Sequence, residues 1–227
     1  MTAARKEQVP PFHGWPIEAK RWFEDLEADN SRTWFHANKR TYDACVRQPI
    51  ESFVAELEEQ LGEAGAGKVF RPNRDTRFSA DKSPYKTAAA ALITRPGGSG
   101  YYLQLSSAGL LTGAGTYGFD KQQLERYRAS VDHDRRGQAL AGIVDGLVKA
   151  KYELGGEALT TAPRGYAKDH KRIALLRHKG LYAGRSHPWR KWVSTAEAKD
   201  RIMADWQTLN PLLDWLDANV GGSSEWG

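Results

Sequence analysis

Apolar residues in the first quarter of the chain recur every three to four positions, which is the period of a helix with one buried face. A first helix is predicted between Pro16 and Asp29, and a second after Ser31, whose hydroxyl suits an N-cap. Pro49 is predicted to open a third helix, because a proline in the first turn loses no hydrogen bond, and the glycine-rich residues 62–67 end it. The positions that carry this pattern are Trp22, Phe23 and Leu26, then Trp34, Phe35, Asn38 and Tyr42, and then Ile50, Phe53, Val54, Leu57 and Leu61.

Short runs typical of β-strands follow between residues 68 and 118. They occupy residues 68–71, 74–78, 87–94, 101–107 and 109–119. The sequence RPGGSG at residues 95–100 separates two of these runs in the manner of a hairpin loop, and residues 79–86 form another loop. The pattern predicts an antiparallel meander.

Helical spacing returns at Asp120, where Gln123 three residues later completes a capping box. Two helices are predicted, with shared faces formed by Leu124, Tyr127, Arg128 and Val131 and by Leu140, Ile143, Val144 and Leu147. A strand at 157–161, a short helix through 173–176, a strand at 180–184 and a helix from about Thr195, bent or restarted at Pro211, complete the pattern. We therefore predict a single α+β domain, in which an antiparallel sheet (about residues 68–118 plus later strands) packs with N-terminal and C-terminal helices. This domain is expected to span residues 12–220, between a loose leader at 1–11 and a loose tail at 221–227.

The composition describes a folded globular chain without a membrane segment. Of the 227 residues 40% are hydrophobic, and eight Trp, nine Tyr and seven Phe supply the aromatic surface that disordered chains lack. No apolar run approaches the roughly 20 residues of a membrane helix, and the N-terminus lacks the apolar segment of a secretory signal. The single cysteine, Cys45, excludes an intrachain disulfide and a multi-cysteine metal site. We expect a cytoplasmic protein with no cofactor and no metal.

The net charge of +5 is unevenly distributed along the chain. Residues 68–86 hold six Lys and Arg against two Asp, and residues 164–191 hold nine against one. The rest of the chain is therefore acidic. If the fold brings the two basic segments together, they form one basic face or cleft, which is the usual footprint of a polyanion or phosphate partner.

The densest charge lies in RDTRFSADKSPYKT, residues 74–87. Its four cations are Arg74, Arg77, Lys82 and Lys86. Arginine's planar group suits the oxygens of a phosphate or carboxylate, although Arg74 and Arg77 face opposite sides if this run is a strand. In the alternative, structural interpretation, Asp75 and Asp81 pair with some of the cations while the Pro-Tyr pair at 84–85 packs the loop down. Two acids cannot neutralise four cations, so a further partner or a ligand is needed.

These residues carry a resemblance to a known family. The stretch is similar to R-D-x-R-F-S-x-D-K-x-P-Y-K-T, the central signature of the family called domain of unknown function 2461. The similarity extends to TGAGTY at residues 112–117, to PRGYAKDH at 163–170 and to an N-terminal pattern carried here by Asn30, Arg32, Trp34, Phe35, Asn38, Lys39 and Tyr42. Ala114 departs from the pattern, where a glycine is expected. The resemblance implies a single domain of about this length and supplies no reaction.

Other segments carry weaker candidates for chemistry. Arg32, Asn38 and Lys39 are the polar residues of the second helix that could face the signature loop. Gly113, Gly115 and Gly118 could cradle an anion, but a turn or bulge is the favoured interpretation. The second basic segment mixes cations such as Arg164 with the aromatic residues Tyr166, Tyr182, Trp189 and Trp192, and its three histidines lack zinc-site spacing.

Two functions of different classes fit this sequence, beside a purely structural one. The first is a domain that binds or acts on a small phosphorylated or anionic ligand, and it ranks first because a pure phosphate-backbone binder has little need of the signature's acids. The second is a nucleic-acid-binding protein that uses residues 68–86 and 164–191. The expected ligand contacts are Arg74, Arg77, Lys82, Lys86, Arg32, Asn38, Lys39 and Arg164, and the acid–base candidates are Asp75, Asp81 and Lys82. No membrane partner is expected.

Overall fold

The computed structural model of the chain describes residues 10–61, 66–77 and 80–222. The predicted leader at 1–11 and tail at 221–227 lie almost wholly outside these residues. The chain divides into two compact units. Unit 1 comprises Met1–Leu92, Gln104–Leu110 and His187–Arg201, and unit 2 comprises Ile93–Leu103, Leu111–Ser186 and Ile202–Gly227.

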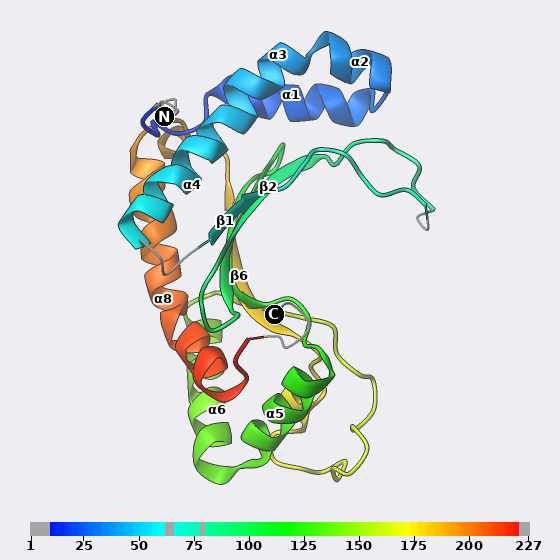
Figure 1. Cartoon of the computed structure of the whole chain (residues 1–227), viewed down its shortest axis with the longest axis vertical. Helices are drawn as coiled ribbons and strands as arrows, with labels where there is room; N and C mark the ends of the chain where they lie inside the picture. Colours follow the sequence, from blue (N-terminus) through cyan, green and yellow to red (C-terminus); the bar gives the residue numbers. More distant parts are fainter. Residues whose placement is uncertain (1–9, 62–65, 78–79, 223–227) are drawn as a thin grey trace, which may run out of the picture. The chain divides into compact units, whose positions relative to one another are not determined.

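Unit 1 opens with the predicted helices (Figure 1). They are α1 (Ile17–Ala28), α2 (Arg32–Ala37), α3 (Lys39–Tyr42), the π-helical turn η1 (Asp43–Arg47) and α4 (Gln48–Leu61). Ser31 is the N-cap of α2, as predicted, because its hydroxyl accepts the Trp34 N–H. Pro49 lies in the first turn of α4, as predicted, although α4 follows η1 without a break. A proline has no N–H for the carbonyl four residues earlier, and a wider π turn accommodates the loss.

Aromatic side chains form the centre of this helical layer. The Trp22 ring lies 4.9–5.6 Å, between ring centroids, from those of Phe23, Trp34, Phe35 and Tyr42. Burial raises the pKa of Tyr42 to about 12, so its phenol stays neutral. The apolar face predicted for α4 is also buried at Ile50, Phe53, Val54 and Leu57, while the side chain of Leu61 lies outside the described residues.

The strands found in the described residues form one six-stranded antiparallel sheet in the order β1-β2-β3-β4-β6-β5. They are β1 (Ala66–Val69), β2 (Ala88–Thr94), β3 (Gly100–Ser106), β4 (Gly109–Thr116), β5 (Glu153–Gly155) and β6 (Leu181–Pro188). The meander and the hairpin loop at 95–100 are confirmed, with the Arg95 N–H donating to the Ser99 carbonyl. Two predicted strands are wrong: residues 74–77 form no strand, and residues 157–161 contribute only a single bridge at Ala158. Residues 153–155 pair with β6 instead.

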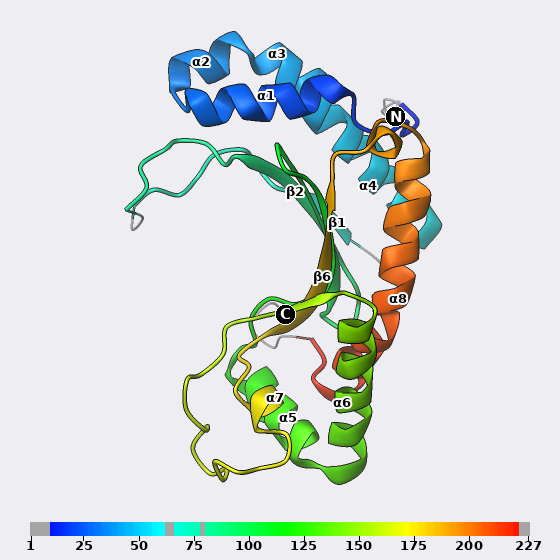
Figure 2. The ribbon, with the colours of Figure 1, turned by 180° about the vertical axis from the view of Figure 1, so that it is seen from behind.

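The helices of unit 2 follow the sequence pattern closely. They are α5 (Lys121–Asp132), α6 (Asp134–Lys149), α7 (Ile173–Leu176) and most of α8 (Glu197–Asn219). Asp120 and Gln123 form the predicted capping box at the start of α5. Figure 2 shows α7 beside α5, where the Tyr127 hydroxyl donates to the Leu175 carbonyl (2.9 Å). Helix α8 runs through Pro211 without a break, so it does not restart there.

None of the helices in the described part of the chain combines the length and apolar character needed to cross a bilayer.

Candidate functional site

The signature residues form a loop whose two arms pair with each other in unit 1 (Figure 1). This signature loop, residues 70–87, connects β1 to β2. The Arg74 N–H donates to the Pro84 carbonyl (2.9 Å), and the Lys86 N–H donates to the Pro72 carbonyl (2.8 Å). The positions of Phe78 and Ser79 are outside the described residues. The pairing fixes which residues of the two arms lie opposite one another.

Tyr85 anchors the signature loop to the helices of unit 1. Its ring is 4% exposed and stacks on Phe35 at a centroid distance of 3.8 Å and an interplanar angle of 10°. The side-chain amide of Asn30 binds both main-chain groups of Tyr85, donating to its carbonyl and accepting from its N–H, each at 3.1 Å. The loop is therefore held in place by an aromatic stack and a two-point hydrogen bond.

Both acidic residues of the signature form ion pairs with its arginines, as the structural interpretation predicted. Asp81 forms an ion pair with Arg74 and accepts the Ser83 N–H (2.9 Å). Asp75 accepts Arg77 Nε (3.0 Å) and Nη2 (2.7 Å) in a two-point pair. The Arg77 guanidinium holds the pKa of Asp75 below its usual value, so this carboxyl stays ionised at neutral pH. A carboxylate in that state is a weak general base.

The lysines of the signature bind carbonyl oxygens rather than acids. Lys82 Nζ donates to the Thr76 carbonyl (2.9 Å). Lys86 Nζ donates to the Arg71 carbonyl (3.1 Å) and lies 5.6 Å from the ring centre of Phe70. Burial, followed by the positive charge of Arg71, lowers the pKa of Lys86. A carbonyl satisfies hydrogen bonds but leaves the full positive charge uncompensated.

Arg71 and Phe70 are site residues that the sequence patterns missed. Arg71 falls within the basic segment 68–86 but just outside the signature residues 74–87, so no motif marks it. Its proximity to Lys86 follows from the pairing of the loop's arms, which the sequence does not show. Lys68 Nζ also lies 5.7 Å from the Phe70 ring, which adds a third cation to this cluster.

The polar candidates of the second predicted helix separate in the structure. Asn38 caps α2, donating to the Trp34 carbonyl (2.9 Å), and its own carbonyl accepts Trp22 Nε1 (3.2 Å). Lys39 forms an ion pair with Asp43 on the helix surface. Arg32 is exposed, and within the described residues it forms no hydrogen bond or ion pair. Asn38 and Lys39 are thus engaged in the helices themselves, and Arg32 is open to solvent.

The two glycines of TGAGTY allow close contact between strands β4 and β6. A Cβ at Gly113 would lie 3.2 Å from the Ala183 carbonyl oxygen, and one at Gly115, whose φ is +144°, would lie 2.4 Å from Tyr182 Cα. Both glycines lie within β4 and not in a turn, and their missing side chains allow the close approach of β6. Ala114 between them is buried at 2% exposure and requires no third glycine.

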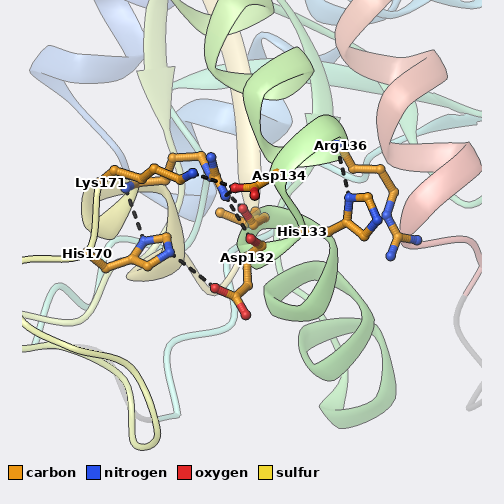
Figure 3. A network of polar contacts seen from close by, with 8 residues as sticks. Asp132, His133, Asp134, Arg136, His170 and Lys171 are labelled. Atoms are coloured by element: carbon orange, nitrogen blue, oxygen red, sulfur yellow. Dashed lines mark hydrogen bonds and ion pairs between the residues drawn. The ribbon is translucent and has the colours of Figure 1, made fainter.

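A network of polar contacts holds the end of the segment 156–172 at the corner between α5 and α6 in unit 2 (Figure 3). The Arg172 guanidinium, 8% exposed, donates to the last two carbonyls of α5, those of Val131 (2.6 Å) and Asp132 (2.7 Å). His170 Nδ1 accepts the Arg172 N–H (3.1 Å), and its Nε2 lies 3.1 Å from Asp132 Oδ1. Both nitrogens of His170 are engaged, which favours a structural role. Arg164, on the same segment, is exposed.

Two concave surfaces of unit 1 are lined by residues outside the signature loop. One, of about 450 Å³, is lined by Arg40, Asp43, Ala44, Arg47, Gln48 and Glu51. Another, of about 610 Å³, is lined by Arg190, Lys191, Trp192, Thr195 and Glu197. Residues 68–86 belong to unit 1 and residues 164–186 to unit 2. Within residues 10–61, 66–77 and 80–222, no group of three or more His, Cys, Asp or Glu is placed to hold a metal ion.

Comparison with known proteins identifies a family for the chain but no individual relative. No curated protein and no solved structure matches the chain. The family model described as conserved hypothetical protein (DUF2461) matches residues 18–215, which is most of the 227-residue chain and includes the whole signature loop. The chain therefore belongs to the conserved hypothetical protein family DUF2461.

Proposed function

We propose that the protein binds a small phosphorylated or otherwise anionic ligand at the signature loop, through Lys86 and Arg71. The observation that supports this most is a pair of neighbouring cations, Lys86 and Arg71, of which only Arg71 feels an acid, Asp75, whose pKa its charge helps to lower. Lys86 is half-buried and its pKa is lowered by burial and by Arg71. Within the described residues neither cation forms an ion pair with a carboxylate. An anion placed between them would replace their mutual repulsion with two charge-assisted contacts.

The other signature residues support this site in different ways. Asp81 and Arg74 fix the loop's form, since Asp81 also binds the loop's own main chain. The pair of Arg77 and Asp75 is open to water, with side chains 77% and 53% exposed. Exposed ion pairs contribute little, so an anionic ligand can compete for Arg77. Because Asp75 is held ionised, we propose binding and assign no reaction to Asp75, Asp81 or Lys82. The cytoplasmic address and the basic cleft belong to the same proposal.

The test is calorimetric titration with inorganic phosphate, pyrophosphate and a sugar phosphate. Lys86→Gln and Arg71→Gln each remove one charge from the site, and the Gln amide can still donate to the carbonyl that Lys86 binds. Because a hydrogen bond between charged groups is worth about 1.5–3 kcal/mol, each variant is expected to lower affinity about 10-fold to 100-fold. Lys20→Gln is the matched control, because it removes the same charge from an ion pair on α1, between Lys20 and Glu24.

Two outcomes would contradict the proposal. The first is no heat of binding with any of the three anions. The second is an equal loss of affinity in Lys20→Gln, which would show that net charge and not this loop attracts the anion. If Lys86→Gln instead unfolds the protein, the loop's lysine is a structural element and the structural interpretation of the signature is correct.

A further inference from the structure

One of the concave surfaces of unit 1 combines a tryptophan with two exposed cations. It has a volume of about 610 Å³ and is lined by Arg190, Lys191, Trp192, Thr195 and Glu197, and we call it the Trp192 hollow. These residues lie between the end of β6 and the start of α8 and include most of the short 3-10 helix η3 (Lys191–Ser194). Small-molecule sites have volumes of about 300–1,000 Å³, so the hollow can accommodate one small ligand.

The main chain of the Trp192 hollow is held by several contacts within unit 1. The Trp192 carbonyl accepts both the N–H (3.1 Å) and the hydroxyl (3.0 Å) of Thr195. Val193 is fully buried, and its carbonyl accepts the Trp15 N–H (2.9 Å). Gly14, at φ +91°, packs so closely that a Cβ there would lie 2.5 Å from the Thr195 nitrogen. The segment is therefore preorganised, which lowers the entropic cost of binding a ligand.

The indole of Trp192 is half-buried and is held by two neighbouring side chains. The Arg201 guanidinium lies 5.0 Å from the ring centre, and the His187 ring meets it edge-on at a centroid distance of 5.4 Å. Arg201 also pairs with Glu197, whose Oε1 lies 2.8 Å from Nε and 2.7 Å from Nη2. The only acid that lines the hollow is therefore compensated by Arg201, and this pair adds no net charge to the hollow.

Arg190 and Lys191 carry the uncompensated charge of the hollow. Both residues line it, and both are exposed. Within the part of the chain that the structure describes, neither side chain forms a hydrogen bond, an ion pair or a contact with an aromatic ring. Because they are consecutive residues beside Trp192, the hollow presents two free positive charges next to a half-buried indole.

We propose that the Trp192 hollow binds a small, free phosphate monoester that carries an aromatic ring, with the phosphate between Arg190 and Lys191 and the ring against Trp192. A phosphate monoester has a charge of about −1.5 to −2 at pH 7, which matches two cations. A carboxylate or a phosphodiester carries a single charge, so the charge favours a free monoester over an acidic peptide or a nucleic-acid strand. Arginine suits phosphate oxygens, and an indole offers a flat apolar surface to a ring. The proposal does not depend on the signature loop.

The experiment is a calorimetric titration of the full chain with AMP, which has both a monoester phosphate and an aromatic ring. Three related compounds each lack one feature: ribose 5-phosphate has no ring, adenosine has no phosphate, and cyclic AMP keeps the ring but is a diester. Each is expected to bind at least about 10-fold more weakly than AMP, because a lost stacking contact or a lost charged contact typically costs a factor of that order.

Variants of the hollow test the same contacts from the side of the protein. Arg190→Gln and Lys191→Gln are each expected to weaken AMP binding about 10-fold, because each removes one charged contact to the phosphate. Trp192→Leu keeps an apolar side chain and is expected to weaken AMP binding by about the same factor. The matched control is Arg21→Gln, because Arg21 of α1 is exposed and forms no ion pair within the described residues. It should bind AMP within about twofold of the unchanged protein.

The proposal is overturned if AMP does not bind, or if it binds no more tightly than cyclic AMP or ribose 5-phosphate. A loss in Arg21→Gln equal to that in Arg190→Gln also overturns it. If Trp192→Leu fails to fold, the variants of the two exposed cations still decide the result. Lys86→Gln is expected to leave AMP binding unchanged, so this proposal and the anion site of the signature loop can fail separately. Loss of AMP binding in Lys86→Gln but not in Arg190→Gln would place AMP at the signature loop and overturn the proposal.

Discussion

Replacing Asn30 by Ala tests whether the signature loop is held by its two-point contact with the helices. The Asn30 amide is the partner of both main-chain groups of Tyr85, at 3.1 Å each. Alanine removes both hydrogen bonds and adds no new group. The Phe35–Tyr85 stack remains in the variant, so the loop is expected to open more often rather than to detach.

The size of the effect follows from the two main-chain groups that lose their partners. A buried donor or acceptor without a partner costs about 1–3 kcal/mol, and the lower end applies here because Asn30 is half-buried and water can reach part of the site. We therefore expect about 2 kcal/mol for the two groups together. Since 1.4 kcal/mol is a factor of ten, the open population of the loop should rise about 25-fold.

Limited digestion with trypsin measures this opening directly. The loop contains four trypsin sites, after Arg74, Arg77, Lys82 and Lys86, and cleavage of a transiently open segment follows its open population. Asn73→Ala is the matched control, because Asn73 is exposed on the same loop and only its main chain bridges to Tyr85. Its cleavage rate should stay within about twofold of the unchanged protein.

An unchanged cleavage rate in Asn30→Ala would refute the reasoning, because the two hydrogen bonds would then contribute nothing to closure. An equal increase in both variants would show that the loop responds to any substitution. If the loop also carries the anion site, Asn30→Ala should weaken phosphate binding and accelerate cleavage. Lys86→Gln should weaken binding alone, so the two variants separate the shape of the loop from its charge.

Two further predictions concern buried charge. Arg172→Leu is expected to lower the free energy of unfolding by about 3 kcal/mol in urea, because two carbonyls at the end of α5 lose a charged donor, and Arg172→Lys should recover less than half of it. At Glu56 burial disfavours the charge, but Lys199 and the Phe12 N–H outweigh it and lower the pKa below the ordinary 4.5. The stability from this lowered pKa is present above pH 4.5 and lost as the pH falls through the folded pKa, so Glu56→Gln should flatten the acid side of the stability curve.

Elements with a strong local signal could be predicted from the sequence. The helices of residues 17–61 and 120–149 have clear apolar faces, and Ser31 and Asp120 cap theirs as expected. The strands at 88–94 and 100–106 are joined by a glycine-containing turn whose geometry only a few residues can adopt, with Gly98 at φ +92°. Such features depend on neighbouring residues and therefore appear in the local pattern.

The strand predicted at residues 74–78 is absent from the described residues 74–77 because side chains there compete for main-chain hydrogen bonds. The sequence predicts a strand at residues 74–78, but the Asp75 side chain accepts the Arg77 N–H two residues later. In the predicted loop at 79–86, the Asp81 side chain accepts the Ser83 N–H in the same way. Asp favours such turns and is uncommon in strands, so the turn at Asp75 replaces the predicted strand. The opposite error occurs at residues 153–155, where pairing with β6 imposes a strand on a sequence with no strand signal.

The candidate site in the signature loop depends on which strands become neighbours, which single-chain patterns do not encode. Lys86 meets Arg71 because the loop's arms pair. The charge count of the signature was correct, since two acids cannot neutralise four cations. What the count could not show is which cations the acids take.

The pairing of those charges changes which residues deserve mutation first. The arginines of the signature appear better suited to phosphate, yet Arg74 and Arg77 are the two cations whose charge is already compensated by Asp81 and Asp75. Lys86 donates to a carbonyl and forms no ion pair within the described residues, and it lies near Arg71, another cation. Uncompensated charge attracts an anion more strongly than charge already in an ion pair, so an anionic ligand should depend more on Lys86 and Arg71 than on Arg77. If Arg77→Gln abolishes phosphate binding while Lys86→Gln leaves it intact, this ordering is wrong and the ligand must displace Asp75.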